Sequence, residues 1–526
     1  MNADSEPADG SFLHKPSGRF YRVYRQGGQF RHEEVIRTPE GKEIARVDLP
    51  MRYLIGSGNF SRTYIVEVDG FLHESPITWY SSKNKWDMSP GYDSAVHDSF
   101  ERPVSVDCLA CHSGRAAPVD GSAHRVAFHE QAIGCENCHG PGSLHQELRR
   151  RKNSEMGADD FTIVNPRKLS RGLSEAICAT CHLSGPATIE LRGRQAGDFR
   201  PGMPLTDYRI PYRFEGTDQM TVVGHVEQMH LSACYQKTES LTCLTCHDPH
   251  QSAAPKDKTA FFRQKCLNCH ENQPCRLETA ERLKKDGTDN CVACHMPRGD
   301  TDIPHIAFTH HRIGRHSRQS AAEPEGILRL APAYDDSHLS DIDRRRNLGL
   351  AYLQSCFDPK YVKYASAFRE RAMMELTAVE KAGLNDADTL VGLAQLFATI
   401  TPNRACDYAR RAIEANDLSP KLHSLALMVI ASRDFQEGNY AEAAKSLEEL
   451  VRLFRTSEHW RTLGICYLRM NQSEKALDAM KKAREIRPFR PAIYLGLADV
   501  YRRMGDEKNA IENIEVARWL KEHGQD

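Results

Sequence analysis

The sequence lacks both a long apolar segment and an excess of charge of either sign. Its 526 residues include 70 Lys and Arg against 71 Asp and Glu, a formal net charge of −1. A chain balanced in this way has no field that attracts nucleic acid or an anionic lipid surface, so we expect neither partner. No apolar run approaches the length of a bilayer, so we expect no membrane span and see no secretion signal in the numbered chain.

The middle of the chain is also poor in aliphatic residues. Between about residues 90 and 320 the sequence loses hydrophobic periodicity and is rich in Gly, Pro and short polar turns. A chain of this length is expected to form two or three domains, yet this stretch cannot build a conventional apolar core. Cysteine is abundant there instead: fourteen of the 17 cysteines lie between Cys108 and Cys294. The others are single, and we expect them in helix-packing core positions: Cys356, Cys406 and Cys466.

Twelve of these cysteines form six Cys-x-x-Cys-His motifs. Two thiols one helical turn apart can form thioethers with the two vinyl groups of a porphyrin, and the adjacent imidazole can bind its iron. Zinc ribbons and thioredoxin-like redox pairs use Cys-x-x-Cys but need no histidine directly after it. Six repetitions therefore favour six covalently attached haem c groups over zinc or disulfides. The motifs are Cys108-Cys111-His112, Cys135-Cys138-His139, Cys178-Cys181-His182, Cys243-Cys246-His247, Cys266-Cys269-His270 and Cys291-Cys294-His295.

Six irons bound by six motif histidines leave six further axial positions. Residues 90–320 contain more non-motif histidines than these positions need, and few methionines, so bis-histidine ligation is favoured over His/Met ligation. The alternative for each histidine is a surface or hydrogen-bonded imidazole. Six histidines near the motifs are the candidates for these positions. His97 precedes the first motif, His145 follows the second, His225 precedes the fourth, His250 follows the fourth, and two follow the last: His305 and His311.

Several segments resemble a known family. "SPGY…VHDSFERPV…CLACH", "IGCENCHGPGSLH", "GHVEQMHLSACY…LTCLTCHDPH" and "NCVACHMPR…DIPHIAFTHHRI" are similar to multihaem c-type cytochromes related to the tetrahaem electron acceptor of ammonia-oxidising bacteria. The whole chain resembles proteins that fuse such a haem region to tetratricopeptide repeats. The resemblance implies that the distal ligands include His145, His225 in preference to His230, His250 and His305. This chain has six motifs where the named protein has four, so His97 and His311 rest on their positions alone.

The two ends of the chain have ordinary secondary-structure patterns. "RFYRVYRQGGQFRHEEVI" and "RTYIVEVDGFLHESPITWY" alternate around Gly-Gly and Asp-Gly turns, which predicts β-hairpins. From about residue 339 onward, Ala- and Leu-rich segments repeat with a period near 34, as in a tetratricopeptide repeat; an ordinary helical bundle is the alternative. Two units are strict: Trp460, Leu463, Gly464, Tyr467, Ala476, Ala483 and Pro488, then Tyr494, Leu497, Ala498, Tyr501, Ala510 and Ala517.

These patterns together predict a multidomain chain. Its predicted parts are a flexible N-terminal tail (1–18), a small β-strand region (19–89), a haem-packed hexahaem cytochrome domain of irregular chain and short helices (90–318), a linker (319–338) and an all-α tetratricopeptide-repeat solenoid (339–526). Two haem-region cysteines stand outside the motifs, Cys234 and Cys275; a disulfide between them and two free thiols are both open.

The function that the sequence favours is electron transfer along closely spaced, mostly bis-histidine haems. The repeats would dock redox partner proteins, hold a homo-oligomer together, or only brace the haem region. The first alternative is a reductase of small nitrogen or sulfur oxyanions at one open haem, although all six motifs keep their histidine; its candidate proton donors are Arg209, Arg213, His230 and Tyr235. The second alternative is a subunit of a polymeric extracellular haem wire. Because haem c is attached outside the cytoplasm, we expect a periplasmic or extracellular protein whose export signal has been removed.

Overall fold

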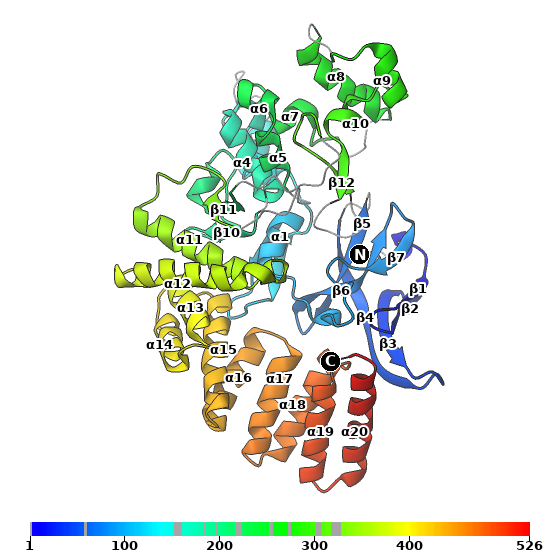
Figure 1. Cartoon of the computed structure of the whole chain (residues 1–526), viewed down its shortest axis with the longest axis vertical. Coiled ribbons are helices and arrows are strands. Elements are labelled where there is room, and N and C mark those ends of the chain that lie inside the picture. The colour runs from blue at the N-terminus through cyan, green and yellow to red at the C-terminus, as the bar shows by residue number, and fades with distance from the viewer. Residues whose placement is uncertain are drawn as a thin grey trace. The chain divides into compact units, whose positions relative to one another are not determined.

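The computed structural model forms two compact units, each described here by itself (Figure 1). Unit 1 comprises residues 1–131 and 376–526, and unit 2 comprises residues 132–375. This division differs from the five predicted segments, because the first Cys-x-x-Cys-His motif belongs to unit 1 and the other five belong to unit 2. The structure describes residues 3–56, 60–151, 160–183, 185–195, 197–215, 224–251, 256–271, 275–300, 307–316 and 328–525.

Unit 1 begins with an antiparallel meander in which each strand pairs with the next along the chain. Both predicted hairpins are confirmed: Gly27 and Gly28, and then Asp69 and Gly70, form the turns with positive φ, which two-residue hairpin loops of this type require. A short 3-10 turn, Ala3–Ser5, precedes the sheet. The strands are β1 (Gly10–His14), β2 (Arg19–Gln26), β3 (Gln29–Arg37), β4 (Glu43–Ile55), β5 (Ser61–Val68), β6 (Phe71–Tyr80) and β7 (Lys85–Met88).

The structure differs from the predicted flexible tail over residues 1–18, because parts of this segment pack on the sheet. Residues 10–14 pair with β2 as strand β1. The Phe12 ring stacks on Tyr21 with centroids 5.2 Å apart, and the Tyr64 hydroxyl donates a 2.7 Å hydrogen bond to the buried Glu6 carboxylate. Tertiary contacts with the sheet therefore order a segment whose polar composition suggests a solvated tail.

The helices of unit 1 follow the predicted repeat pattern. Consecutive helices from α13 to α20 pack together, and α17 also contacts α19. The small residues of the two strict units are buried, including Ala476, Ala483 and Ala510. Residues 99–131 add a 3-10 turn, Ser99–Glu101, with α1 (Val106–His112), β8 (Arg115–Pro118) and β9 (Val126–Glu130). The later helices are α13 (Ala387–Phe397), α14 (Pro402–Ile413), α15 (Pro420–Gln436), α16 (Tyr440–Leu453), α17 (Ser457–Arg469), α18 (Ser473–Ile486), α19 (Pro491–Arg503) and α20 (Glu507–Glu522).

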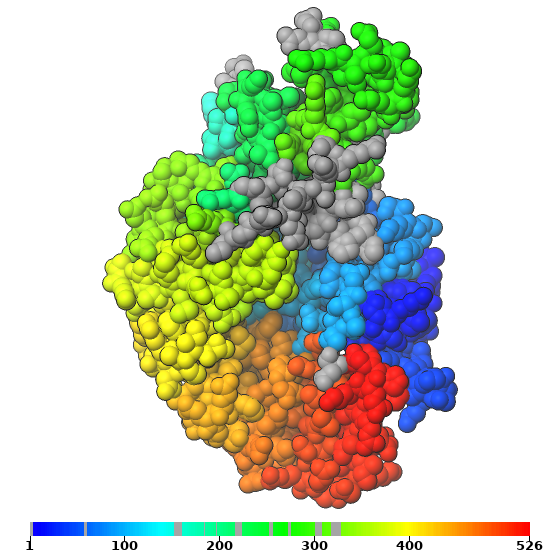
Figure 2. All heavy atoms as spheres, viewed as in Figure 1, coloured from blue at the N-terminus to red at the C-terminus, as the bar shows by residue number. Residues whose placement is uncertain are grey.

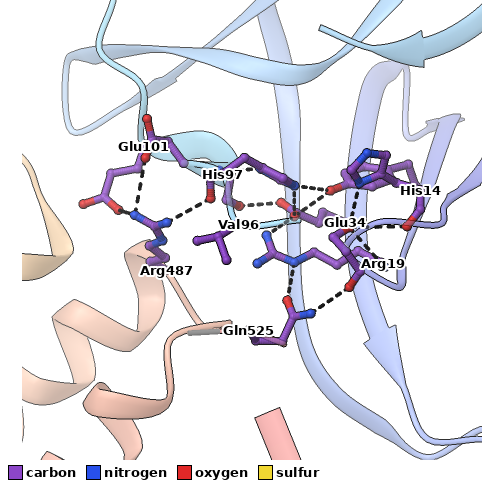
Figure 3. A network of polar contacts seen from close by, with 12 residues as sticks. His14, Arg19, Glu34, Val96, His97, Glu101, Arg487 and Gln525 are labelled. Carbon is purple, nitrogen blue, oxygen red and sulfur yellow. Dashed lines mark hydrogen bonds and ion pairs between the residues drawn. The ribbon is translucent and has the colours of Figure 1, made fainter. Parts of the chain in front are cut away.

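The last repeats and the N-terminal sheet share one hydrophobic core, which contains Tyr21 and Phe30 from the strands and Ile493 and Leu497 from α19. Figure 2 shows the C-terminal residues in red against the N-terminal strands in blue. Polar contacts join the same parts (Figure 3). The buried Arg19 guanidinium donates to Glu34 and to Gln525 across 506 positions of sequence, so the repeats stabilise the sheet directly.

Unit 2 consists of short elements joined by irregular chain, as predicted for the haem region. One apolar cluster of this unit contains Ala176, Ala179, Leu183, Leu205 and Val226, and other buried apolar side chains of the unit include Ile210, Tyr352 and Phe368. The predicted linker (319–338) lies outside the described residues up to position 327, and its described part contains strand β14 (Leu330–Pro332). The helices are α2 (Glu136–His139), α3 (Ser143–Arg150), α4 (Arg171–His182), α5 (His225–His230), α6 (Ala233–Lys237), α7 (Cys243–Cys246), α8 (Lys258–His270), α9 (Thr279–Lys285), α10 (Cys291–His295), α11 (Asp341–Cys356) and α12 (Ala365–Lys381).

Two small sheets complete the described part of unit 2, one of three strands and one of two. Strand β11 lies between β10 and β14, and β12 pairs with β13. The strands are β10 (Ala187–Glu190), β11 (Arg209–Phe214), β12 (Arg298–Asp300), β13 (Ala307–Thr309) and β14 (Leu330–Pro332), with 3-10 turns at Pro166–Lys168, Leu205–Asp207 and Pro359–Tyr364. The chain leaves unit 2 within α12. In the described part of the chain, no helix combines the length and apolarity needed to span a bilayer.

Candidate haem-binding site

Each of the six Cys-x-x-Cys-His motifs closes a helix. The motif histidine is the last residue of α1, α2, α4, α8 and α10, and it is the C-cap residue of α7. In α2 the helix stops because Gly140, with φ +72°, turns the chain away. Helical geometry places the two cysteines of a motif nearly one turn apart on one face. This is the arrangement that the thioether hypothesis requires.

The second, third and fourth motifs open onto one cavity of unit 2. Its volume is about 1180 Å³, which is larger than most small-molecule pockets, at roughly 300–1,000 Å³. Aliphatic side chains such as Ile177, Leu244 and Ile313 line it together with Met229. The motif residues that line it are Cys135, Cys138, His139, Cys178, His182, Cys243, Cys246 and His247, and four predicted distal ligands join them: His145, His225, His250 and His311.

Backbone carbonyls fix the orientation of several of these imidazoles. His139 Nδ1 donates to the Val164 carbonyl at 2.7 Å, and His311 Nδ1 donates to the Thr309 carbonyl at 2.9 Å. A carbonyl only accepts, so Nδ1 carries the proton and Nε2 carries the lone pair. Metal-bound histidines are usually held in this way. Every residue has a backbone carbonyl, so no residue type in the sequence marks these partners and the sequence analysis did not identify them.

Imidazole pairs lie at separations that fit an iron between them. The ring centroids of His139 and His250 are 5.9 Å apart, with 18° between the planes, and those of His247 and His311 are 6.2 Å apart, with 26°. Two imidazoles on opposite faces of one iron have centroids about 6 Å apart, because each metal–nitrogen bond is about 2 Å long and each nitrogen lies about 1 Å from its ring centre.

A third pair is closer. The ring centroids of His182 and His225 are 5.0 Å apart and their planes are nearly perpendicular, at 85°. His225 also lies 4.4 Å from His311. Three motif histidines of unit 2 therefore each have a predicted distal ligand as a neighbour.

Burial keeps these imidazoles in their metal-binding form. It lowers the pKa of His182 and of His247. Burial, assisted by the nearby His225, lowers the pKa of His311 to about 3. Neutral imidazole binds metal, whereas imidazolium does not. The apolar lining, the neutral nitrogens and the paired cysteines of the cavity thus fit haem c.

Thiols of successive motifs also lie beside one another within unit 2. Hydrogen bonds join the Cys178 thiol to that of Cys243, and the Cys266 thiol to that of Cys291. Cys138 and Cys178 line the same cavity, and α8, which carries the fifth motif, contacts α7 and α10, which carry parts of the fourth and sixth motifs. The second to sixth motifs therefore follow one another in space in the order in which they occur in the sequence.

The remaining predicted ligands have other surroundings. His145 lines the cavity, and its Nδ1 lies 2.9 Å from Asp160 Oδ2. His97 is a buried residue of unit 1: its Nδ1 accepts from the Ser99 backbone N–H at 3.1 Å, and its Nε2 lies 2.9 Å from the Tyr21 hydroxyl. Both ring nitrogens of His97 are thus occupied by protein partners (Figure 3). For His97 the structure favours the hydrogen-bonded alternative over an iron ligand. His305 lies outside the described residues.

The other motif residues and the remaining cysteines are placed as follows. His112 and His270 are exposed, and His295 donates from Nδ1 to the Gly314 carbonyl at 3.0 Å. Neither Cys234 nor Cys275 is in a disulfide, and the latter is exposed. The prediction of core positions for the three single cysteines is confirmed, since all are buried: Cys356, Cys406 and Cys466.

No group of three or more His, Cys, Asp or Glu among the described residues could hold a metal ion by protein ligands alone. A haem iron takes only two ligands from the protein, so this finding concerns multidentate protein sites.

Comparison with known proteins identifies the repeats. Residues 491–516 match the tetratricopeptide repeat family. Among solved structures, "Crystal structure of MamA" is 22% identical with a TM-score of 0.28, covering 32% of this chain and 96% of that one. "MamA AMB-1 P212121" is 19% identical with a TM-score of 0.30, covering 36% and 94%. "MamA RS-1 ArsTM double mutant" is 22% identical with a TM-score of 0.30, covering 34% and 95%. The search of curated proteins found no match. The chain therefore contains a tetratricopeptide repeat.

Proposed function

We propose that this protein is an exported hexahaem c-type cytochrome that transfers electrons. The observation that carries the proposal is that six Cys-x-x-Cys-His motifs each close a helix, three of them around one apolar cavity. Each bound haem would supply a one-electron ferric/ferrous couple. The motif cysteines would anchor the porphyrins through thioethers, and the motif histidines would bind the irons.

Two ligand pairs follow from the imidazole separations. His250 would complete the iron site of His139 and His311 that of His247, supported by centroid distances of 5.9 and 6.2 Å. His225 is a neighbour of His182 at 5.0 Å, which is shorter than this separation, so its assignment to the iron of His182 rests on proximity alone. Bis-histidine ligation closes both faces of an iron to substrate and favours low potentials. The two pairs therefore support a carrier rather than a reductase for the haems of the second and fourth motifs.

The route of the electrons is proposed from the order of the thiols. Cys178 lies beside Cys243, and Cys266 lies beside Cys291, so thioethers at these positions would bring the edges of successive porphyrins close together. Electrons would then pass through unit 2 in sequence order, from the second motif to the sixth.

The repeats would dock a redox partner protein in the periplasm or at the cell exterior. Tetratricopeptide repeats commonly bind protein segments, and the match at residues 491–516 supports this role. Because the last repeats share a core with the N-terminal sheet, they would also brace unit 1. The repeats would alternatively hold a homo-oligomer together. Sedimentation of the full chain at several concentrations tests this role, because a monomer at every concentration would rule out a homo-oligomer.

The central experiment is expression behind a cleavable export signal in a host that matures c-type cytochromes. The expected product is red, has sharp reduced-state bands, and carries six haems per chain by pyridine haemochrome assay and intact mass. Replacing both Cys135 and Cys138 by Ala removes one haem, whereas the control Cys234→Ala leaves six. A colourless, folded product would refute the proposal.

Spin state then separates carrier from reductase. Low-temperature electron paramagnetic resonance of the oxidised protein is expected to show low-spin iron for the haems of the cavity. A high-spin signal that is perturbed by nitrite or hydroxylamine would instead favour the reductase alternative.

A further inference from the structure

A buried carboxylate lies beside the third motif, away from the cavity ligands. Glu175 is on α4, one turn before Cys178, and its side chain is only 4% exposed. Three side chains contact it, and with Glu175 they are named here the Glu175 cluster: His230 Nε2 at 2.8 Å, the Tyr235 hydroxyl at 2.9 Å and the Tyr334 hydroxyl at 3.0 Å. A buried charge persists only where hydrogen bonds stabilise it, and these three donors do so.

The geometry fixes which atom can take a proton. His230 Nε2 and both tyrosine hydroxyls donate to the Glu175 oxygens, so the neutral His230 ring keeps its lone pair on Nδ1. Burial, followed by the charge of Glu175, raises the pKa of Tyr235 and of Tyr334, so both remain protonated donors. The His230 side chain is 26% exposed, which allows its Nδ1 to exchange a proton with solvent.

The cluster lies within electrostatic reach of two haem-anchoring positions. The Glu175 charge acts on the thiols of Cys178 and Cys243, which belong to the third and fourth motifs. Other charged groups face the cluster from the packed elements. Arg171 of α4 places its guanidinium 4.0 Å from the Tyr235 ring centre, and Glu227 of α5 and Glu239 after α6 act on the tyrosines.

We propose that the Glu175 cluster is a redox-linked proton site, in which His230 Nδ1 binds a proton from solvent when a haem of the third or fourth motif is reduced. This inference rests on the proposed function. The electron would come from a one-electron donor, such as a reduced redox partner protein, and the bound haem would hold it; the proton would come from water and bind at His230 Nδ1. The electron and the proton together leave the net charge of this region unchanged.

The physical reason is mutual stabilisation of charge. With neutral His230 the cluster carries the full negative charge of Glu175, which favours the more positive ferric state. Reduction removes one positive charge from the neighbouring haem and so raises the affinity of His230 for a proton. By linkage, protonation favours reduction by the same factor.

The test is spectroelectrochemical titration of the full holoprotein from about pH 5 to pH 8, the interval in which histidine normally titrates. One haem reduction potential is expected to fall as pH rises. The equilibrium constant for reduction is expected to decrease by up to tenfold per pH unit, which corresponds to 59 mV for one electron. In His230→Gln this slope is expected to be lost, and Glu175→Gln is expected to lose it as well. The control His338→Gln, an exposed histidine of unit 2, is expected to keep it.

The outcomes distinguish this inference from the proposed function. Haem bands with potentials that do not change with pH in the wild type would overturn the proton site and leave the cytochrome proposal intact. A slope that survives in both His230→Gln and Glu175→Gln would place the proton elsewhere and would also overturn it. A chain without haem bands would refute the proposed function itself. If Glu175→Gln fails to fold, His230→Gln, which keeps the carboxylate and its two tyrosine donors, decides the question.

Discussion

The buried ion pair between Arg19 and Glu34 gives a prediction whose magnitude can be worked from the structure. Both side chains are at most 1% exposed, and Arg19 Nη1 lies 2.7 Å from Glu34 Oε1. Arg19 also donates to Gln525 at 2.7 Å and lies 4.3 Å from the Phe489 ring centre. Arg19→Met keeps most of the side-chain volume but leaves the Glu34 carboxylate buried without its cation. Breaking a buried pair in this way costs about 3–5 kcal/mol.

Urea denaturation followed by tryptophan fluorescence measures this cost. All four tryptophans lie in unit 1, so the signal reports the unit that contains the ion pair: Trp79, Trp86, Trp460 and Trp519. With an m value of about 3 kcal/mol per M, the urea midpoint is expected to fall by roughly 1–1.7 M.

A double-mutant cycle decides whether the lost charge partner is the cause. Replacing both Arg19 and Glu34 by Met removes the unpaired charge, so most of the lost stability is expected to return. Two outcomes would refute the reasoning. One is a loss of less than about 1 kcal/mol in the free energy of unfolding of Arg19→Met, and the other is a double variant as unstable as Arg19→Met alone.

Three further predictions follow from single sites. Burial lowers the pKa of His32 and of His73 to about 3, below the value in the unfolded chain. The stability that these two neutral histidines give to unit 1 is therefore fully present above about pH 6.5. As pH falls from there towards 3, the free energy of unfolding is expected to decrease by about 1.4 kcal/mol per pH unit for each histidine, measured by urea midpoints. Gly185→Ala places a Cβ 1.7 Å from the Tyr212 carbonyl oxygen. This clash disrupts the pairing between β10 and β11, so the melting temperature is expected to fall by several degrees. His250→Ala is expected to convert one low-spin iron to high spin.

Matched controls accompany these predictions. Gly172→Ala adds a Cβ that meets no atom within 4 Å. Equal melting temperatures for Gly172→Ala and Gly185→Ala would contradict the clash argument. His129→Ala removes an exposed histidine outside the cavity and is expected to leave the spin states unchanged; unchanged spin in His250→Ala would contradict its pairing with His139. A urea midpoint that does not move between pH 6.5 and 5 would contradict the neutral burial of the unit 1 histidines.

The sequence by itself determined the features that depend on neighbouring residues. The Gly27-Gly28 turn and the alternating strands beside it predicted their hairpin, because φ preference and side-chain alternation act over a few positions. The 34-residue period predicted the helix pairs, because each repeat packs on the next one along the chain. The spacing within Cys-x-x-Cys-His predicted that the motif thiols lie one helical turn apart.

Only the tertiary structure decided which distant residues meet. Sequence offered His97 as an iron ligand, but the fold places it between Tyr21 and Ser99, where both ring nitrogens are used. Arg19 and Gln525 are 506 positions apart, and no local pattern reports a contact closed by the whole chain. The proximity of His139 to His250 and the burial of Glu175 have the same origin, since both depend on contacts between distant parts of unit 2 rather than on the residues beside them.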